Sequence, residues 1–370
     1  MTIEQYKKLV YPLTKELCKI PAPSGLEDKR AEFCKKYLEE TGYDNVYIDD
    51  AKNVICGIGC ENSNEITVFA AHTDTVFPDL EPMPYREEDG KAYCPGIGDD
   101  TACLACLLVA AKYFKDQNVS SDKGVLFVCN SCEEGLGNLK GTRALMEEYK
   151  GRVARFITFD GLMDKIVIKC VGSHRYNVEV KTEGGHSFNA FGNENAINHI
   201  SKIVNKIYEI EVPKNGDSKT TYNVGTISGG TSVNTIAQSA SMLCEYRSDD
   251  VECLAIMQKK FEEIFASERS NEVEVKVTKV GDRPCAKGVD EGEFAALLGK
   301  SQSIIEGIIG KEVRLSSGST DCNIPASLGI PAICVGNVLG GGAHTREEWL
   351  EIDSLNQGID VAIELIKAYI

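Results

Sequence analysis

Short apolar runs alternate with longer segments of helical periodicity along most of the chain. Runs of strand length lie at Ile66–Ala71, Val125–Cys129 and Phe156–Phe159, and the segments Thr101–Phe114 and Thr142–Tyr149 have the length and pattern of helices. Strands that alternate with helices predict an α/β layer structure with a largely parallel sheet. Polar residues at the ends of the apolar runs are therefore the first candidates for a functional site.

The pattern changes in the middle of the chain. Between Ser173 and Gly281 it becomes two strand–helix–strand units, with strands at Tyr176–Lys181, Thr220–Ile227, Ser241–Arg247 and Val273–Val280 and helices at Ala196–Ile210 and Val251–Phe265. The α/β pattern then returns with a helix at Phe294–Ile309, a strand at Ala332–Val335 and a last helix from Asp353. We therefore expect an α+β domain at residues 173–282, inserted into a catalytic domain formed by residues 1–172 and 283–370. A chain of 370 residues is long enough for two hydrophobic cores.

Two local patterns precede the first candidate site. Ser24 and Glu27 have the spacing of a capping box, which predicts the start of a helix that runs from Leu26 to about Glu40. The segment Thr73–Asp100 is rich in Pro, Gly and charged residues. A long segment without periodicity of its own is usually functional, so we expect it to form a functional loop.

The chain is acidic, with 56 Asp and Glu against 40 Lys and Arg and a formal charge of −16. This charge repels nucleic acid and anionic membranes, so we expect neither as a partner and favour small neutral or zwitterionic substrates. Acidity that serves only solubility is the alternative. The sequence has no run of about 18 apolar residues, and Met1–Lys8 lacks a secretory pattern, so we expect a cytosolic protein.

The 15 cysteines are spread along the chain, and free thiols are expected because no export signal accompanies them. Two pairs, Cys103/Cys106 and Cys129/Cys132, have the Cys-x-x-Cys spacing of structural zinc sites. Both pairs lie in or next to apolar segments, where cysteine acts as a small core side chain, and we favour that reading.

His72 and Asp74 follow the apolar run Ile66–Ala71. Residues two apart in a strand point to the same side of it. His72 can therefore bind a metal while Asp74 accepts the hydrogen of the other ring nitrogen and orients the imidazole. A turn with satisfied polar side chains is the alternative for this pair.

Two pairs of adjacent acids also stand at the ends of elements. Asp99 and Asp100 follow a Gly-rich stretch and precede a helix, where they suit either a bridging metal carboxylate or a helix N-cap. Glu133 and Glu134 follow an apolar run. Because adjacent side chains diverge, one of them can bind a metal while the other takes a proton from a metal-bound water. An exposed pair of glutamates is the alternative.

Asp160 follows the run Phe156–Phe159, and His344 follows Gly340-Gly341-Gly342-Ala343. With three of the residues above they form a set of two imidazoles and three carboxylates, namely His72, Asp99, Glu134, Asp160 and His344. Three carboxylates and one hydroxide balance the charge of two divalent cations, which suits borderline metals such as zinc.

The order and context of these residues resemble the M20 family of metallopeptidases, which hydrolyse amide bonds with two zinc ions. The resemblance extends over nearly the whole chain and rests on motifs in the same order, namely His72-x-Asp74, Gly98-Asp99-Asp100, Glu133-Glu134-Gly135, Asp160-Gly161, Gly184-Gly185-His186-Ser187 and the Gly-rich segment before His344. It implies a zinc-exopeptidase-like mixed sheet with helices on both faces and an inserted ferredoxin-like lid and dimerisation domain.

The resemblance also implies which residues hold the metal. His72 and Asp160 would bind one Zn²⁺, Glu134 and His344 the other, and Asp99 would bridge the two. Two ions per chain are expected, and Co²⁺ or Mn²⁺ can take the place of zinc.

The same resemblance implies the catalytic roles. Glu133 would be the general base, and Asp74 the orienting carboxylate. The peptide bond between Asp99 and Asp100 is expected to be cis. The chain departs from the family at Thr101, where a lysine is common, so any role of that lysine is in doubt.

Three residues of the inserted domain match positions that act on the substrate in this family. His186 would reach the site of a second subunit and stabilise the tetrahedral oxyanion, which makes a homodimer the expected assembly. Read locally, His186 is a turn residue. Arg247 and Asn234 match residues that bind carboxylate and carbonyl groups of the substrate. A surface ion pair with Asp249 or Asp250 is the alternative for Arg247.

We therefore expect a metal-dependent hydrolase of amide bonds in short peptides. Ser131–Gly137 most resembles the tripeptidase and aminopeptidase branch of the family. An N-acyl-amino-acid amidohydrolase that uses the same site is the second reading. A metal-binding or ligand-binding protein without turnover is the rival from another class, but such a protein has no need of a base at Glu133.

Overall fold

The computed structural model describes residues 1–370 and divides the chain into two compact units. Unit 1 comprises Met1–Cys170 and Ala286–Ile370, and unit 2 is the continuous segment Val171–Cys285. Unit 1 is thus assembled from two stretches of chain, and unit 2 is inserted between them. None of the helices has the length and apolar composition that a membrane span requires.

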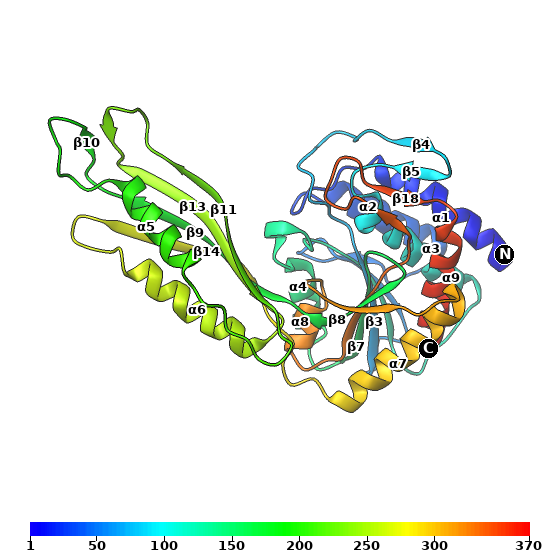
Figure 1. Ribbon diagram of the computed structural model, residues 1–370. Coiled ribbons are helices and arrows are strands. Elements are labelled where there is room, and N and C mark those ends of the chain that lie inside the picture. Colours follow the sequence, from blue (N-terminus) through cyan, green and yellow to red (C-terminus); the bar gives the residue numbers. More distant parts are fainter. The chain divides into compact units, whose positions relative to one another are not determined.

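Unit 1 is built on an eight-stranded mixed sheet of order β1-β2-β6-β3-β7-β16-β8-β15. Its strands are β1 Tyr47–Ile48, β2 Val54–Ile58, β3 Ile66–His72, β6 Val125–Asn130, β7 Val153–Phe159, β8 Lys165–Cys170, β15 Arg314–Gly318 and β16 Ala332–Val335. Strands β3, β7 and β8 of this sheet are labelled in Figure 1. β3 pairs in parallel with β6 and β7, and β7 pairs in parallel with β16. The carboxyl ends of these four central strands therefore lie at one edge of the sheet.

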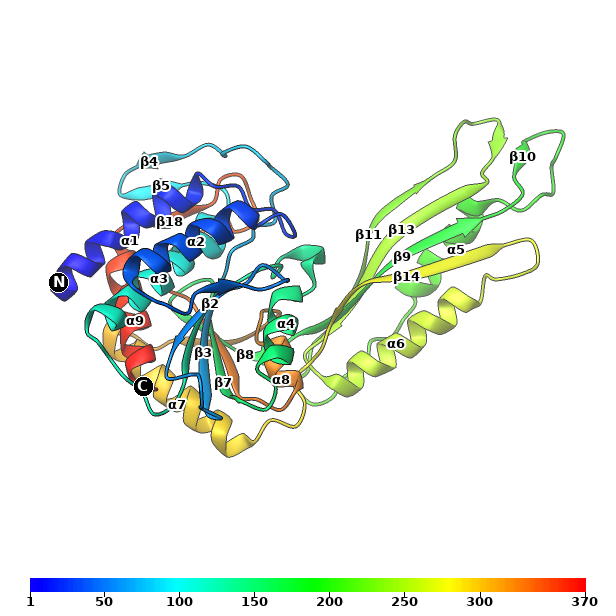
Figure 2. The same cartoon turned by 180° about the vertical axis from the view of Figure 1, so that it is seen from behind.

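Helices cover both faces of this sheet (Figure 2). One face packs against α1 Ile3–Cys18, α2 Asp28–Thr41, α3 Ala102–Asp116, α7 Glu291–Ile309 and α9 Ser354–Lys367, and the other against α4 Lys140–Glu148 and α8 Asn323–Ser327. Along β3, Phe69 and Ala71 enter the first core, and Val68 and Ala70 enter the second. A strand buried on both faces explains the unbroken apolar run in the sequence. The predicted mixed sheet with helices on both faces is confirmed.

The core of unit 1 accounts for the cysteine-rich segments. In α3, the residues Ala102–Ala111 are buried without a break, and Cys103 and Cys106 lie within this run. Cys129 is buried at the end of β6. All 15 cysteines are free thiols, and most of them are small side chains of the two cores.

The capping box predicted for Ser24 and Glu27 is wrong. Helix α2 begins at Asp28, and no side chain caps it. Ser24 Oγ instead donates to Asp74 Oδ2 at 2.5 Å. The buried Glu27 carboxylate accepts from Gly25 N at 2.6 Å and from Cys132 N at 3.2 Å. Contacts with distant segments have taken the place of the local cap.

Residues 73–100, predicted as a long loop, contain the short strands β4 Arg86–Glu88 and β5 Lys91–Tyr93. β5 pairs with β18 Trp349–Glu351, which in turn pairs with β17 Gly340–Gly341. This second, four-stranded sheet brings the segment that precedes Asp99 next to the segment that carries His344. Two candidate ligands far apart in sequence are thereby placed on neighbouring loops.

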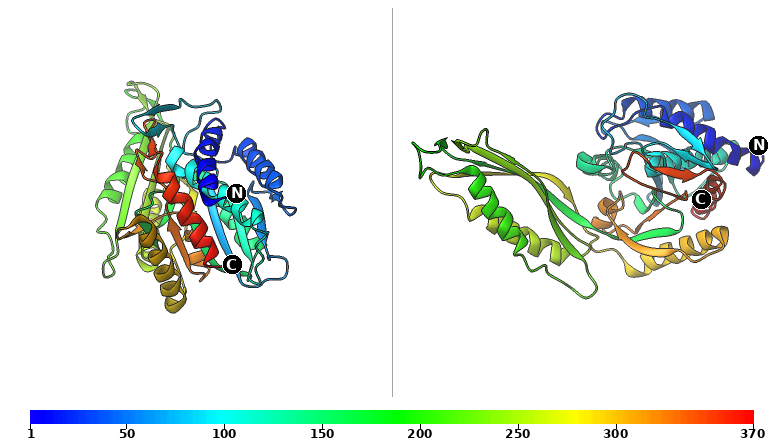
Figure 3. Two further views of the ribbon diagram at one scale, coloured as in Figure 1. Left: turned by 90° about the vertical axis from the view of Figure 1, so that its right-hand side faces the viewer. Right: turned by 45° about the horizontal axis from the view of Figure 1, so that its top comes forward.

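Unit 2 is a four-stranded antiparallel sheet of order β11-β13-β9-β14. Its elements are β9 Gly172–Lys181, α5 Ala196–Tyr208, β11 Thr220–Gly229, β13 Ser239–Ser248, α6 Val251–Ala266 and β14 Glu274–Arg283, and the short strands β10 Gly185–His186 and β12 Thr235–Ile236 pair separately. Helices α5 and α6 lie on one face of the four-stranded sheet (Figure 3). The order of strands and helices and the order of strands in the sheet are those of a ferredoxin-like fold. Unit 2 has its own hydrophobic core.

Candidate metal centre

The five residues predicted as metal ligands all belong to unit 1 and gather at the carboxyl edge of its sheet. His72 ends β3, Asp160 follows β7, and Glu134 follows β6. Asp99 lies in the turn η1 Ile97–Thr101 before α3, and His344 lies between β17 and β18.

The carboxylate of Asp99 stands between two imidazoles. His72 Nε2 lies 3.1 Å from Asp99 Oδ1, and His344 Nε2 lies 3.1 Å from Asp99 Oδ2. His344 Nε2 is also 3.2 Å from Glu134 Oε1. Each oxygen of Asp99 therefore faces a different imidazole, an arrangement that would suit a carboxylate shared by two metal ions.

The potential donor atoms form three overlapping groups. Within each group the donor atoms lie within 4.8 Å of one another, and the groups are His72, Asp100 and Asp160, then His72, Glu133 and Glu134, then Asp99, Glu134 and His344. Glu134 Oε1 is buried and has no hydrogen-bond partner, although it lies next to His344. A buried carboxylate oxygen without a donor is costly unless a cation binds it.

Asp74 holds the ring of His72. His72 Nδ1 lies 3.0 Å from the carbonyl oxygen of Asp74 and 3.4 Å from its Oδ1, so Nε2 is the nitrogen that faces Asp99. The buried Asp74 carboxylate also accepts from the backbone N–H groups of Glu133 and Glu134, each at 2.9 Å. Burial opposes ionisation of Asp74, but His72 and these donors outweigh it and lower the pKa of Asp74. One carboxylate thus ties the end of β3 to the glutamate pair.

The electrostatics of the cluster indicate an excess of negative charge. Burial and the nearby charge of Asp99 raise the pKa of Asp160 to about 7. The adjacent carboxylates of Asp99 and Glu134 raise the pKa of His344 to about 10. Burial disfavours a charged His72, but Asp100, Asp74 and Asp99 outweigh it and raise its pKa. The two imidazoles do not balance the carboxylates around them, so the set of residues fits bound divalent cations.

Asp100 differs from its neighbour. The peptide bond between Asp99 and Asp100 is cis, as the resemblance implies. Asp100 is fully buried, and its Oδ2 accepts from the backbone N–H of His72 at 2.9 Å. Neither acid caps α3, whose N-cap residue is Thr101. The N-cap reading of this pair is therefore wrong.

Glu348 is a residue of the centre that the sequence did not reveal. It is 2% exposed, and its carboxylate accepts from the backbone N–H groups of Gly96, Gly98 and Asp99 at 2.8, 2.8 and 2.9 Å. Burial and the charge of Asp99 raise the pKa of Glu348 to about 7. Its spacing from His344 was the only available signal, and spacing does not reveal contacts with backbone groups.

Two further buried polar residues support the centre without having been predicted. Arg30 donates to the carbonyl oxygen of Thr73 at 2.9 Å and to those of Leu17 and Ile20 at the end of α1. Asp321 accepts from Asn130 Nδ2, at the end of β6, and from Thr142 Oγ1. Both groups fix the backbone at the edge of the sheet from which the ligands project.

The three predicted substrate residues lie in unit 2. His186 is exposed, and its Nδ1 accepts from the backbone N–H of Phe188 at 3.2 Å. Arg247 donates from Nε and Nη2 to Glu245 at 2.8 and 3.0 Å, so its ion-pair partner is Glu245 and neither Asp249 nor Asp250. Asn234 is exposed, and its Oδ1 accepts from the hydroxyl of the nearby Ser232 at 2.8 Å.

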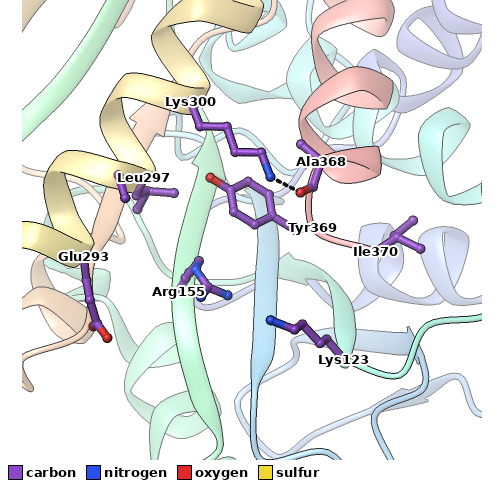
Figure 4. A pocket seen from close by; sticks show the side chains of 9 residues that line it. Lys123, Arg155, Glu293, Leu297, Lys300, Ala368, Tyr369 and Ile370 are labelled. Carbon is purple, nitrogen blue, oxygen red and sulfur yellow. Dashed lines mark hydrogen bonds between the residues drawn. The ribbon is translucent and has the colours of Figure 1, made fainter.

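A cavity of about 380 Å³ lies elsewhere in unit 1, near the amino ends of β6 and β7 (Figure 4). Lys123, Arg155 and Lys300 line it together with Glu293, and Lys300 donates to the carbonyl oxygen of Ala368. Three cations and one carboxylate do not form a divalent metal site. The groups of potential metal ligands lie at the opposite, carboxyl edge of the sheet.

Comparison with known proteins agrees with this geometry. The model of peptidase family M20/M25/M40 matches residues 68–368, a range that includes all five candidate ligands. Succinyl-diaminopimelate desuccinylase of Corynebacterium glutamicum is 26% identical over 374 residues, which cover 97% of this chain and 95% of that protein. Among solved structures, a tripeptidase from Staphylococcus aureus has a TM-score of 0.78 at 24% identity, and aminopeptidase PepT from Bacillus cereus has a TM-score of 0.75 at 23% identity, each covering 98% of both chains. The chain therefore belongs to peptidase family M20/M25/M40 and is a metal-dependent hydrolase of amide bonds.

Proposed function

We propose that this hydrolase cleaves short peptides and that its two metal ions are zinc. The observation that carries the proposal is the Asp99 carboxylate, whose oxygens face His72 and His344 at 3.1 Å each. His72 and Asp160 would hold one ion, Glu134 and His344 the other, and Asp99 both. Two imidazoles and three carboxylates are a donor set that suits zinc, and Co²⁺ or Mn²⁺ can replace it.

When bound, the ions lower the pKa of a water towards neutrality and polarise the scissile carbonyl. Glu133 removes a proton from the attacking water and later delivers it to the leaving amine. Its carboxylate is buried, and its donor atom lies within 4.8 Å of donor atoms of His72 and Glu134, which would each hold a metal ion. Asp74 keeps the imidazole of His72 in the tautomer whose Nε2 is free to bind a metal.

Unit 2 supplies the groups that bind the substrate. His186 Nδ1 accepts a backbone hydrogen bond, so the proton of the neutral ring lies on Nε2. That N–H is a suitable donor to an oxyanion, and in this proposal it serves the site of a second subunit in a homodimer. Arg247 binds a carboxylate of the substrate, and Asn234 binds a carbonyl. We place the enzyme in the cytosol, because its 15 free thiols suit a reducing compartment.

N-acylated amino acids are the second candidate substrates, because the desuccinylase relative removes an acyl group from an amine. Protein purified without chelator and supplied with Zn²⁺, Co²⁺ or Mn²⁺ is assayed on di- and tripeptides and, in parallel, on N-acetyl and N-succinyl amino acids. We expect the highest kcat/KM on peptides and close to two metals per chain by elemental analysis. Cleavage of the acylated amino acids alone would support the second candidate. If no amide bond in the panel is cleaved, the protein is a binding protein without turnover. A reproducible single metal per chain would remove the bridging role of Asp99.

A further inference from the structure

We propose that Glu348 is a positioning residue that fixes the Asp99 carboxylate between the two metal sites. Its Oε1 accepts from the N–H groups of Gly98 and Asp99 at 2.8 and 2.9 Å, and its Oε2 accepts from the N–H of Gly96 at 2.8 Å. The inference rests on the two-metal function proposed above and assigns to Glu348 the geometry of the shared ligand.

The loop of Asp99 is shaped around this carboxylate. Gly96 has a φ of +75°, a backbone conformation that favours glycine. The N–H groups of Gly96, Gly98 and Asp99 converge on the one carboxylate, while Ile97 N donates to Cys94 instead. A Cβ added to Gly98 would lie 3.3 Å from Glu348 Oε1, so the backbone passes too close for a side chain to fit without a shift. A buried carboxyl group whose oxygens accept from three N–H groups is a strong and directional restraint.

Glu348 also belongs to the segment that carries His344. Its backbone N–H donates to Thr345 at 3.3 Å, and its carbonyl oxygen accepts from Cys94 N at 3.1 Å. The side chain and the backbone of one residue therefore join the loop of Asp99 to the loop of His344. The ligand atoms that those loops present, Asp99 Oδ2 and His344 Nε2, lie 3.1 Å apart.

This arrangement predicts a particular pattern of metal loss. A bridging carboxylate serves both ions, so displacing Asp99 weakens both, whereas loss of a terminal ligand weakens mainly one. Residues that orient a metal ligand typically change metal affinity by about 10–100-fold when they are replaced. Glu348 touches no substrate in this proposal, so the KM for the substrate is expected to stay within about threefold.

The test uses the full chain with Glu348→Gln, because the amide nitrogen of Gln cannot accept a hydrogen bond and at least one loop N–H loses its partner. The matched control is Glu347→Gln, the same change at the exposed neighbour that pairs with Arg86 at 3.0 Å. Zn²⁺ titrations of the metal-free proteins give the affinity of each site. We expect Glu348→Gln to weaken both sites by about 10–100-fold, to lower kcat at limiting metal and to recover partly with excess metal, and we expect Glu347→Gln to match the wild type.

A general loss of stability is separated from positioning by Leu365→Ala, a core truncation in α9 that lowers the unfolding temperature without touching the loop. The proposal would be overturned if Leu365→Ala weakened metal affinity as much as Glu348→Gln does. It would also be overturned if the metal affinity of both sites in Glu348→Gln stayed within about threefold of the wild type. If Glu348→Gln does not fold, Gly98→Ala perturbs the same contact from the other side and must weaken both sites by several-fold. Wild-type protein that binds fewer than two metals would instead overturn the function on which the inference rests.

Discussion

Adjacent identical side chains in this centre lie in opposite environments. Burial opposes ionisation of Asp99, but hydrogen bonds from His344 and His72 outweigh it and lower its pKa. Burial raises the pKa of Asp100, whose carboxylate accepts a single backbone N–H from His72. Asp99 is therefore suited to bind cations. Asp100 is suited to hold the end of β3 through the backbone N–H of His72. Chemical role in this cluster follows from position rather than from residue type.

The same distinction leads to a prediction for the glutamate pair. Glu133→Gln removes the proposed base and keeps its size, so metal content should persist while kcat falls by about 10²–10⁴-fold. Glu134→Gln should weaken one metal site, because a neutral amide is a poorer zinc ligand than a carboxylate, and excess metal should restore part of the activity. Elemental analysis and kcat at two metal concentrations measure both effects. Equal metal loss in the two variants, or metal rescue of Glu133→Gln, would show that the roles are reversed.

At the residue scale, the candidate metal ligands could be predicted from the sequence, but the residues that hold the ligand-bearing segments in place could not. His72, Asp160 and the glutamate pair stand where apolar strands stop, and the edge of a sheet is visible in the pattern. Glu348 and Arg30 bind backbone groups of segments far along the chain, and backbone groups leave no trace in residue type. Glu27 shows the same limit, since its partner Cys132 N lies in a different element and the local capping pattern was misleading.

At the scale of elements, strands and helices that carry an apolar pattern could be predicted, and short strands without such a pattern could not. The seven residues of β3 are all buried, so its apolar run was readable. The three residues of β4 are all exposed, and β15 is largely exposed, so neither has an apolar pattern. The small sheet that joins the loops of Asp99 and His344 depends on such strands. Its pairing comes from tertiary contacts between distant segments.

Strand β13 carries an ion pair whose effect on stability should depend on pH. Glu245 accepts from Arg247 at 2.8 Å and from Arg175 at 3.2 Å. Burial opposes ionisation, but the two arginines outweigh it and lower the pKa of Glu245. A carboxyl with a lowered folded pKa stabilises the fold above its unfolded pKa of about 4.3, and this contribution is lost as the pH falls through the folded value.

We therefore expect Glu245→Gln to lower the free energy of unfolding of unit 2 by about 1 kcal/mol at pH 7. The difference in the free energy of unfolding between variant and wild type should shrink below pH 4, because protonation then removes the charge of the wild-type carboxyl group. Thermal unfolding at pH 7 and pH 3 measures it. Glu179→Gln on β9, whose exposed pair with Lys276 spans 3.5 Å, is the control and should change stability by less than about 0.5 kcal/mol. A difference for Glu245→Gln that is the same at both pH values would exclude the ion pair as its cause.

At the scale of the whole molecule, the proposed homodimer makes a prediction about mixed subunits. His186→Ala and Glu133→Gln should each inactivate the enzyme when alone. If His186 serves the site of the partner, subunits of the two variants that exchange form some heterodimers with one intact composite site, and part of the activity returns. Activity is followed after mixing, with exchange verified by differently labelled subunits. Exchange without any recovery would place His186 in its own chain's site or outside the reaction.

The division into two units predicts how metal affects unfolding. All five proposed ligands lie in unit 1, whereas unit 2 is one continuous segment, Val171–Cys285, with a core of its own. A metal that binds only the folded state stabilises it by about 2.7 kcal/mol when the free metal is 100 times its Kd, so chelation should lower the unfolding temperature of unit 1 alone. Calorimetry of the full chain with Zn²⁺ and with chelator should show one transition that shifts and one that does not. Residues 171–285 expressed separately should unfold cooperatively at the temperature of the unshifted transition, with or without Zn²⁺. A fragment that fails to fold, or that Zn²⁺ stabilises, would show that unit 2 depends on unit 1 or binds metal itself.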